Sequence, residues 1–149
     1  MGNPKSFAES SKVGINSYAL AGLVRSALFC TKPDGRYAYV CPQFLPAKRV
    51  AWMNIQRLTA DIPNIRYSDS ELRADLPNGA RIRLYGDDNP DCLRGLDLDG
   101  VILDEFADMR SSEWGWVIRR MLADRKGWAV FIGTPKGRKT RRRTGRPST

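Results

Sequence analysis

The stretch Gly100-Val101-Ile102-Leu103-Asp104-Glu105 decides the fold class. Its apolar residues form a continuous run, which is typical of a strand that is buried on both faces of a sheet. The later stretch WAVFIG (128–133) has the same character. Segments with helical spacing of apolar residues alternate with these two strands. The sequence therefore predicts an α/β domain with a mainly parallel sheet and helices on both faces.

Other segments complete this alternation. Apolar residues recur at helical spacing in three segments, and Ser17 suits the N-cap position of the first of them. A hairpin is predicted where two short alternating runs flank the turn Asn78-Gly79. The expected elements are a helix from Ser17, a strand at 37–41, a helix at 47–62, a hairpin at 71–86, a helix around 114–122 and the two buried strands.

The composition excludes several classes of protein. The 149 residues suffice for one domain with a core, and no apolar run approaches a membrane span. Cys30, Cys41 and Cys92 are too few and too scattered for a disulfide framework or a zinc site. The chain has no histidine, which excludes catalytic triads, general bases and metal ligands that depend on it.

The positive charge is concentrated at the C-terminus. Residues 136–149, KGRKTRRRTGRPST, hold seven of the 25 basic residues and none of the 16 acidic residues. The remainder therefore carries only 18 minus 16, or +2. Because a biased, acid-free segment cannot form a core, residues 138–149 are predicted to be a disordered basic tail. Nucleic-acid binding is expected of this tail alone.

Asp104 and Glu105 are the candidate metal-binding and catalytic residues. They follow a buried strand, and ligands bind at the carboxyl ends of strands in α/β sheets. In Walker-type nucleotide hydrolases the aspartate helps to hold Mg²⁺ and the glutamate polarises the attacking water. Thr134 follows the second buried strand, where a hydroxyl group senses a γ-phosphate, and Arg94 lies in a loop that suits an arginine finger.

The residues 91–109, DCLRGLDLDGVILDEFADM, resemble the Walker B region of the large terminase subunit of tailed bacteriophages. Three further stretches, 37–52, 78–95 and 121–137, are similar to the ATPase domain of that family, so that the resemblance covers roughly residues 17–137. The resemblance implies a P-loop NTPase-like fold of the additional-strand type. It also implies a DNA-packaging motor that hydrolyses ATP and carries a separate nuclease domain.

The resemblance also implies roles and partners. Asp104 would be the Mg²⁺ ligand, Glu105 the catalytic carboxylate, Thr134 the coupling residue and Arg94 a finger acting on a neighbouring subunit. ATP and Mg²⁺ would be the cofactors. Double-stranded viral DNA, the small terminase subunit, the portal and further copies of the chain would be the partners, in the cytoplasm of the bacterial host and without a membrane.

The N-terminal segment departs from the family pattern. In one alignment Gly14 matches the last glycine of a phosphate loop, Ile15 stands where the lysine belongs and Asn16 where the Mg²⁺-binding hydroxyl belongs. A slip of one residue makes Ser17 the hydroxyl residue and puts Asn16 at the lysine position. An isoleucine supplies no charge for phosphates. Residues 1–16 also show no clear apolar period and are rich in Ser, Gly, Asn and Lys. They are therefore expected to be an irregular segment with a degenerate phosphate loop, without the strand that precedes it in the family.

A truncated or frame-disrupted gene, such as a prophage remnant, is the expected origin. The missing strand is expected to leave a gap between strands 100–104 and 128–133, with marginal stability and association as consequences. The prediction is a terminase motor-domain fragment over 17–137 with negligible ATPase activity. A non-enzymatic nucleic-acid-binding or interaction protein with a basic tail is the alternative. Another additional-strand ATPase such as a helicase is a third, which Gly-Thr-Pro-Lys after strand 128–133 disfavours.

Overall fold

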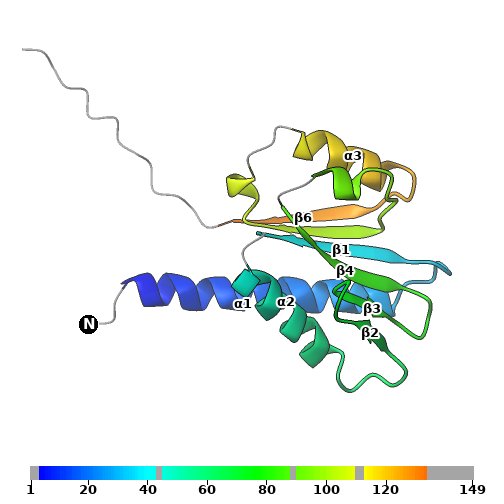
Figure 1. Ribbon diagram of the computed structural model, residues 1–149, viewed down its shortest axis with the longest axis horizontal. Coiled ribbons are helices and arrows are strands. Elements are labelled where there is room, and N and C mark those ends of the chain that lie inside the picture. The colour runs from blue at the N-terminus through cyan, green and yellow to red at the C-terminus, as the bar shows by residue number, and fades with distance from the viewer. Residues whose placement is uncertain (1–3, 43–44, 88–89, 110–112, 134–149) are drawn as a thin grey trace, which may run out of the picture.

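The structure is a computed structural model of the chain and describes residues 4–42, 45–87, 90–109 and 113–133. The predicted alternation of strands and helices is confirmed, with helices on both faces of one sheet (Figure 1). The elements in chain order are α1 (Pro4–Leu28), β1 (Arg36–Cys41), α2 (Leu45–Leu58), β2 (Arg66–Ser68), β3 (Arg73–Asp75), β4 (Arg81–Gly86), η1 (Pro90–Leu93), β5 (Gly100–Asp104), η2 (Phe106–Asp108), α3 (Trp114–Ala123) and β6 (Trp128–Ile132).

The sheet has six strands in the order β2-β3-β4-β1-β5-β6. The four strands β4, β1, β5 and β6 run parallel to one another, and β2 and β3 add an antiparallel edge. The predicted hairpin is confirmed as the β3–β4 pair, with Gly79 at a φ of 89° in its turn. The sequence did not reveal β2, whose three residues are too few to show a period.

Alternate residues of the central strands face opposite layers. Tyr37, Tyr39 and Cys41 of β1 pack with α1 and α2, whereas Ala38 and Val40 pack on the α3 side. Both sides of β5 are likewise covered, and all five of its residues are buried. A strand in this position needs apolar side chains on both faces, which explains its uninterrupted apolar run.

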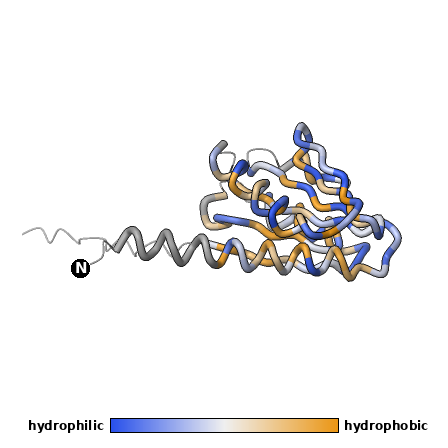
Figure 2. Tube along the Cα trace, turned by 90° about the horizontal axis from the view of Figure 1, so that it is seen from below, coloured by the Kyte–Doolittle hydropathy of each residue, from blue (hydrophilic) through white to orange (hydrophobic). Residues whose placement is uncertain are grey.

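The helix α1 lies along one face of the sheet. Its buried side chains Leu20, Leu23, Val24 and Ala27 recur every three or four residues and form the stripe that contacts the strands. Figure 2 shows the same recurrence of hydrophobic residues along the helix. The stripe confirms the helical part from Ser17 onward, but Ser17 lies inside α1 and not at its N-cap, because the helix begins at Pro4.

The N-terminal part of α1 corrects the expectation for residues 1–16. The structure describes residues 4–16 of this segment, and there the helix begins at Pro4 and runs without interruption through Gly14 and Ser17, so these residues do not form the expected irregular phosphate loop. Proline suits the first position of a helix, and a single interior glycine costs only about 1 kcal/mol. The absence of an apolar stripe therefore did not indicate a loop.

The expected gap in the sheet is also corrected. β5 and β6 are direct neighbours, paired in parallel from Gly100 opposite Trp128 to Asp104 opposite Ile132. The connection through α3 is the usual one between adjacent parallel strands. Among the described residues, the sheet ends instead at β2 on one side and at β6 on the other, and no further strand pairs with the outer side of β6.

Candidate functional site

The candidate site lies at the carboxyl end of the parallel strands. Asp104 is the last residue of β5 and Glu105 follows it directly. Both are buried, with relative exposures of 6% and 8%. They are buried because β5 is flanked by β1 and β6 and covered by helices on both faces. Two adjacent carboxylates in such a position need hydrogen bonds or a cation to offset their loss of hydration.

The backbone at Glu105 has an unusual conformation. Its φ of 54° and ψ of 41° lie in the left-handed region, where the chain turns from β5 into the short helix η2. A non-glycine residue adopts this region at a cost, and such residues gather at functional sites. The chain changes direction at this turn. Asp104 ends the strand, and Glu105 begins the next segment.

Asp104 is held by side chains from two other elements. The Tyr39 hydroxyl of β1 donates to Oδ2 of Asp104 at 2.9 Å, and the Asn16 amide of α1 donates to the same oxygen at 3.3 Å. Burial, and next the charge of Asp104, raise the pKa of Tyr39 far above its ordinary value. The hydroxyl therefore remains a proton donor throughout the physiological range.

Asn16 joins α1 to the site but is incompletely hydrogen-bonded. Its Oδ1 is buried and has no hydrogen-bond partner. Gly14 and Ser17 lie beside it within α1, where backbone N–H groups are used by the helix rather than turned toward an anion. Ile15, at the position predicted for the lysine of a phosphate loop, is 56% exposed. Nucleotide contact at Gly14 and Ser17 stays a prediction.

Cys41 ends the strand β1 next to the site but is not a nucleophile. Burial raises the pKa of its thiol to about 12, although the nearby Lys48 lowers it in part. The thiolate is the reactive form of cysteine, so this side chain is inert at neutral pH. Cys30, Cys41 and Cys92 are free thiols.

Arg94 binds acidic residues of its own chain. Its guanidinium contacts Asp91 at 2.8 Å and Glu113, at the start of α3, at 2.8 Å, and the side chain is half exposed. It lines a groove of about 780 Å³ between residues 94–97 and α3. Thr134, the expected coupling residue, lies outside the described residues.

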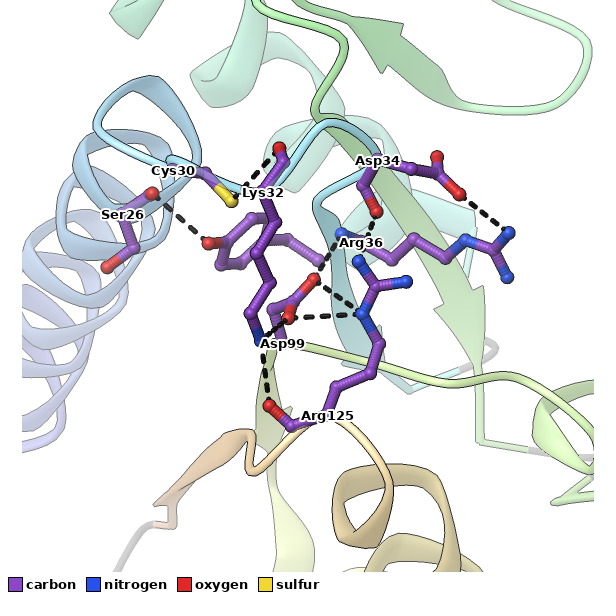
Figure 3. Close-up of polar contacts among 8 residues, drawn as sticks. Ser26, Cys30, Lys32, Asp34, Arg36, Asp99 and Arg125 are labelled. Atoms are coloured by element: carbon purple, nitrogen blue, oxygen red, sulfur yellow. Dashed lines mark hydrogen bonds and ion pairs between the residues drawn. The ribbon is translucent and has the colours of Figure 1, made fainter.

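A second charged cluster lies at the opposite, amino-terminal end of β5 and is shown in Figure 3. Asp99, which precedes β5, accepts hydrogen bonds from Lys32 Nζ at 2.6 Å, from the Arg36 backbone at 2.9 Å and from Arg125 Nε at 3.2 Å. Burial raises the pKa of Asp99, but these donors outweigh it, and the pKa lies below its ordinary value. The cluster joins the turn after α1 to the loop after α3.

The residues at the site suit Mg²⁺, but they do not form a binding loop for the phosphates of ATP. Carboxylate oxygens are the ligands that a hard cation such as Mg²⁺ prefers. Within the part of the chain that the structure describes, three or more metal-ligating side chains do not gather at one place, so protein ligands alone would not complete a coordination shell. A loop that binds phosphate is not formed in 4–28, because this segment is helical throughout.

The family follows from a comparison of the whole chain. The family model of the N-terminal part of the terminase large subunit, T4-like virus type, matches residues 18–140. This chain belongs to the terminase large subunit family. The matched range contains the strand β5, the two carboxylates and β6, so the resemblance of the Walker B region is confirmed. The helicase alternative is not supported.

Terminase sequences and structures agree with this assignment. The large terminase subunits of Thermus phage G20c and Thermus virus P23-45 are each 54% identical to this chain over 50 residues. The large terminase ATPase domain of Thermus phage P74-26 has a TM-score of 0.62 at 28% identity. The large terminase of bacteriophage HK97 has a TM-score of 0.59 and covers 79% of this chain, but its 12% identity shows the fold alone.

The terminase relatives are considerably longer than the matched segments. The aligned residues make up 34% of this chain and 10% of each of the two subunits from G20c and P23-45. They make up 81% of this chain and 55% of the P74-26 ATPase domain, and 26% of the HK97 terminase. No helix in the described part of this terminase chain is long and apolar enough to cross a membrane.

Proposed function

We propose that the chain is a motor-domain fragment of a phage DNA-packaging terminase, with Asp104 and Glu105 as its carboxylate centre. The observation that carries the proposal is the burial of both carboxylates at the carboxyl end of the central strand β5. Ligand sites of parallel α/β sheets lie at this edge. Membership of the terminase family supports the same position.

Asp104 would hold Mg²⁺ in this centre, and the cation would neutralise the charge of nucleotide phosphates when it is bound. Asp104 is a fixed ligand because two donors already orient its carboxylate. Glu105 would accept a proton from the attacking water. Its left-handed backbone turns it away from the direction of the strand. Arg94 would act on a neighbouring subunit and Thr134 would be the coupling residue, as the family resemblance implies.

Independent ATP turnover is not expected of this fragment. The residues at the phosphate-loop position form the continuous helix α1, and Ile15 supplies no cation there. A phosphate contact at Gly14 or Ser17 would require the first turns of α1 to unwind. We therefore infer an ATPase scaffold that retains the two carboxylates of β5 and lacks a formed phosphate loop.

The partners of the whole terminase are proposals for this chain. Double-stranded viral DNA, the small terminase subunit, the portal and further copies of the chain are the partners that the family resemblance implies. Of these partners, DNA is the one that a feature of this sequence supports directly. Residues 136–149 hold seven basic and no acidic residues. The same feature is the basis of the alternative function, a non-enzymatic nucleic-acid-binding protein, which the terminase comparisons do not favour.

Two assays on the purified chain separate these functions. Binding of a fluorescent ATP analogue and of Mn²⁺ is measured beside DNA binding at two salt concentrations. The motor-fragment proposal expects Mn²⁺ binding that Asp104→Asn abolishes. The matched control Asp61→Asn, an exposed carboxylate after α2, leaves it unchanged. DNA binding without any Mn²⁺ binding at Asp104 would favour the non-enzymatic alternative.

ATP hydrolysis tests the inactive phosphate-binding part separately. Wild-type chain and Glu105→Gln are expected to give the same negligible rate, because the phosphate loop is not formed. A wild-type rate above background that disappears in Glu105→Gln would contradict this expectation, and would show that α1 is remodelled around the nucleotide.

A further inference from the structure

The Asp104 carboxylate receives two hydrogen bonds on a single oxygen, from different elements. Tyr39 Oη of β1 lies at 2.9 Å from Oδ2, and Asn16 Nδ2 of α1 lies at 3.3 Å from it. The Tyr39 contact is buried, and Tyr39 itself is 1% exposed. A hydrogen bond to a charged group in such surroundings is among the stronger ones in a protein.

The position of Tyr39 follows from the register of the sheet. Tyr39 lies opposite Ile102, two residues before Asp104, in the parallel β1–β5 pair. Successive residues of a strand alternate between faces, so Ile102 and Asp104 share the α1 face with Tyr39. Two residues of a strand span about 6.6 Å. The side chain of Tyr39 is long enough to bridge this distance along the strand and reach the carboxylate of Asp104. Packing alone would be satisfied by phenylalanine.

The contact from Asn16 is weaker. Its donor distance is longer, and its Oδ1 is buried without a partner, which costs part of what the hydrogen bond contributes. Tyr39 is therefore the side chain that fixes Asp104. Asn16 attaches α1 to a carboxylate whose orientation is already set from β1.

We propose that Tyr39 is a positioning residue, whose hydroxyl holds the Asp104 carboxylate in a set orientation for a divalent cation. The part that concerns the cation rests on the proposed function. Partners that orient metal ligands change metal affinity by about 10–100-fold when they are removed. The hydroxyl of Tyr39 should act in this way on Asp104, without contact to the cation.

The same strand supplies a matched control. Tyr37 lies two residues before Tyr39 on the same face of β1, is also buried, and donates its hydroxyl to the backbone oxygen of Ser26 at 3.2 Å. Tyr37→Phe and Tyr39→Phe remove the same group from neighbouring positions of one strand. Only the second removes a donor from Asp104.

The test uses the full chain, with Mn²⁺ affinity measured by electron paramagnetic resonance. Tyr39→Phe is expected to weaken Mn²⁺ binding by about 10–100-fold, and Tyr37→Phe to leave it unchanged. The second readout is the carboxyl ¹³C signal of Asp104 without metal, assigned through Asp104→Asn. It should move in Tyr39→Phe and stay in place in Tyr37→Phe.

Each outcome decides the proposal. Mn²⁺ binding that depends on Asp104 but changes by less than about twofold in Tyr39→Phe would overturn it. Should the wild-type chain bind no Mn²⁺, the cation part of the proposed function fails, and the ¹³C signal alone decides whether Tyr39 positions Asp104. Should Tyr39→Phe not fold, Tyr39→Phe with Asp104→Asn is made. A folded double variant supports the coupling, and an unfolded one assigns Tyr39 to packing alone.

Discussion

Gly100 and Trp128 lie opposite each other in the β5–β6 pair, and the indole ring covers the glycine so closely that a Cβ atom on Gly100 would lie 2.5 Å from two ring carbons. The two strands are therefore in direct contact where the sequence led us to expect a gap. The pair begins the register that brings Asp104 to the same level as Ile132.

Gly100→Ala should lower the free energy of unfolding by about 1–3 kcal/mol, because the added methyl group displaces the Trp128 ring. Gly22→Ala is the matched control, since Gly22 is an exposed helical glycine and nothing lies within 4 Å of the position that its new methyl group would take. That change should stabilise the chain by up to about 1 kcal/mol. Urea unfolding of both variants gives the two values, and equal effects would show that β6 does not lie against Gly100.

Asp99→Asn should destabilise the chain by about 1.5–3 kcal/mol at neutral pH, because Lys32 and Arg125 lose a charged acceptor. The exposed pair of Asp34 with Arg36 gives the control, and Asp34→Asn should cost less than about 1 kcal/mol. Urea unfolding at several pH values is the measurement.

The pH dependence of the Asp99 effect has a definite sign. The folded state holds the pKa of Asp99 below its ordinary value, so the carboxylate contributes its full stability above the unfolded pKa of about 3.9. This contribution is lost as the pH falls through the folded pKa. The difference between wild type and Asp99→Asn should therefore shrink below about pH 4, and a constant difference would contradict the ionised cluster.

Val130→Lys should reduce self-association of the chain. Val130 and Phe131 are 41% and 54% exposed on the open edge strand β6, beside an apolar groove of about 450 Å³ that α1 also lines. An edge of this kind is a template for pairing with another chain, and a lysine opposes such pairing. Val50→Lys, at an exposed valine of α2, is the control. A wild-type chain that is monomeric in light scattering at all concentrations would remove the basis for this prediction.

DNA binding should depend on the basic tail and not on DNA sequence. Six of the seven cations in 136–149 lie at 138–146, and replacing these six by glutamine keeps the length of the chain. Affinity should fall with salt with a slope of roughly −0.9 per phosphate neutralised, and the variant should lose both affinity and slope. Binding by the variant at moderate salt would place the contact on the nearly neutral body.

The local pattern of residues was sufficient for most of the secondary structure. The continuous apolar run Val101–Leu103, followed by two carboxylates, favoured a strand covered on both faces, and the stripe from Leu20 to Ala27 favoured one face of a helix. Asp104 and Glu105 were placed at the carboxyl edge for the same reason. These features depend on the periodicity of apolar side chains, which can be read directly from the amino-acid sequence.

The N-terminal segment was mispredicted because its lack of an apolar period and its resemblance to a phosphate loop were both taken to indicate irregular structure. Gly14 and Ser17 were aligned with a phosphate loop, but the helix that begins at Pro4 continues through this region. One glycine is a small cost against the propagation of a long helix.

Only the tertiary structure decided which distant residues meet. Tyr39 reaches Asp104 because β1 is the neighbour of β5 with Tyr39 opposite Ile102, and Lys32 reaches Asp99 because the turn after α1 passes the start of β5. Strand order and register arise from the packing of all layers together. The amino-acid sequence determined the strands, helices and their chemistry, whereas their juxtaposition, and with it the hydrogen bond that orients Asp104, exists only in the folded chain.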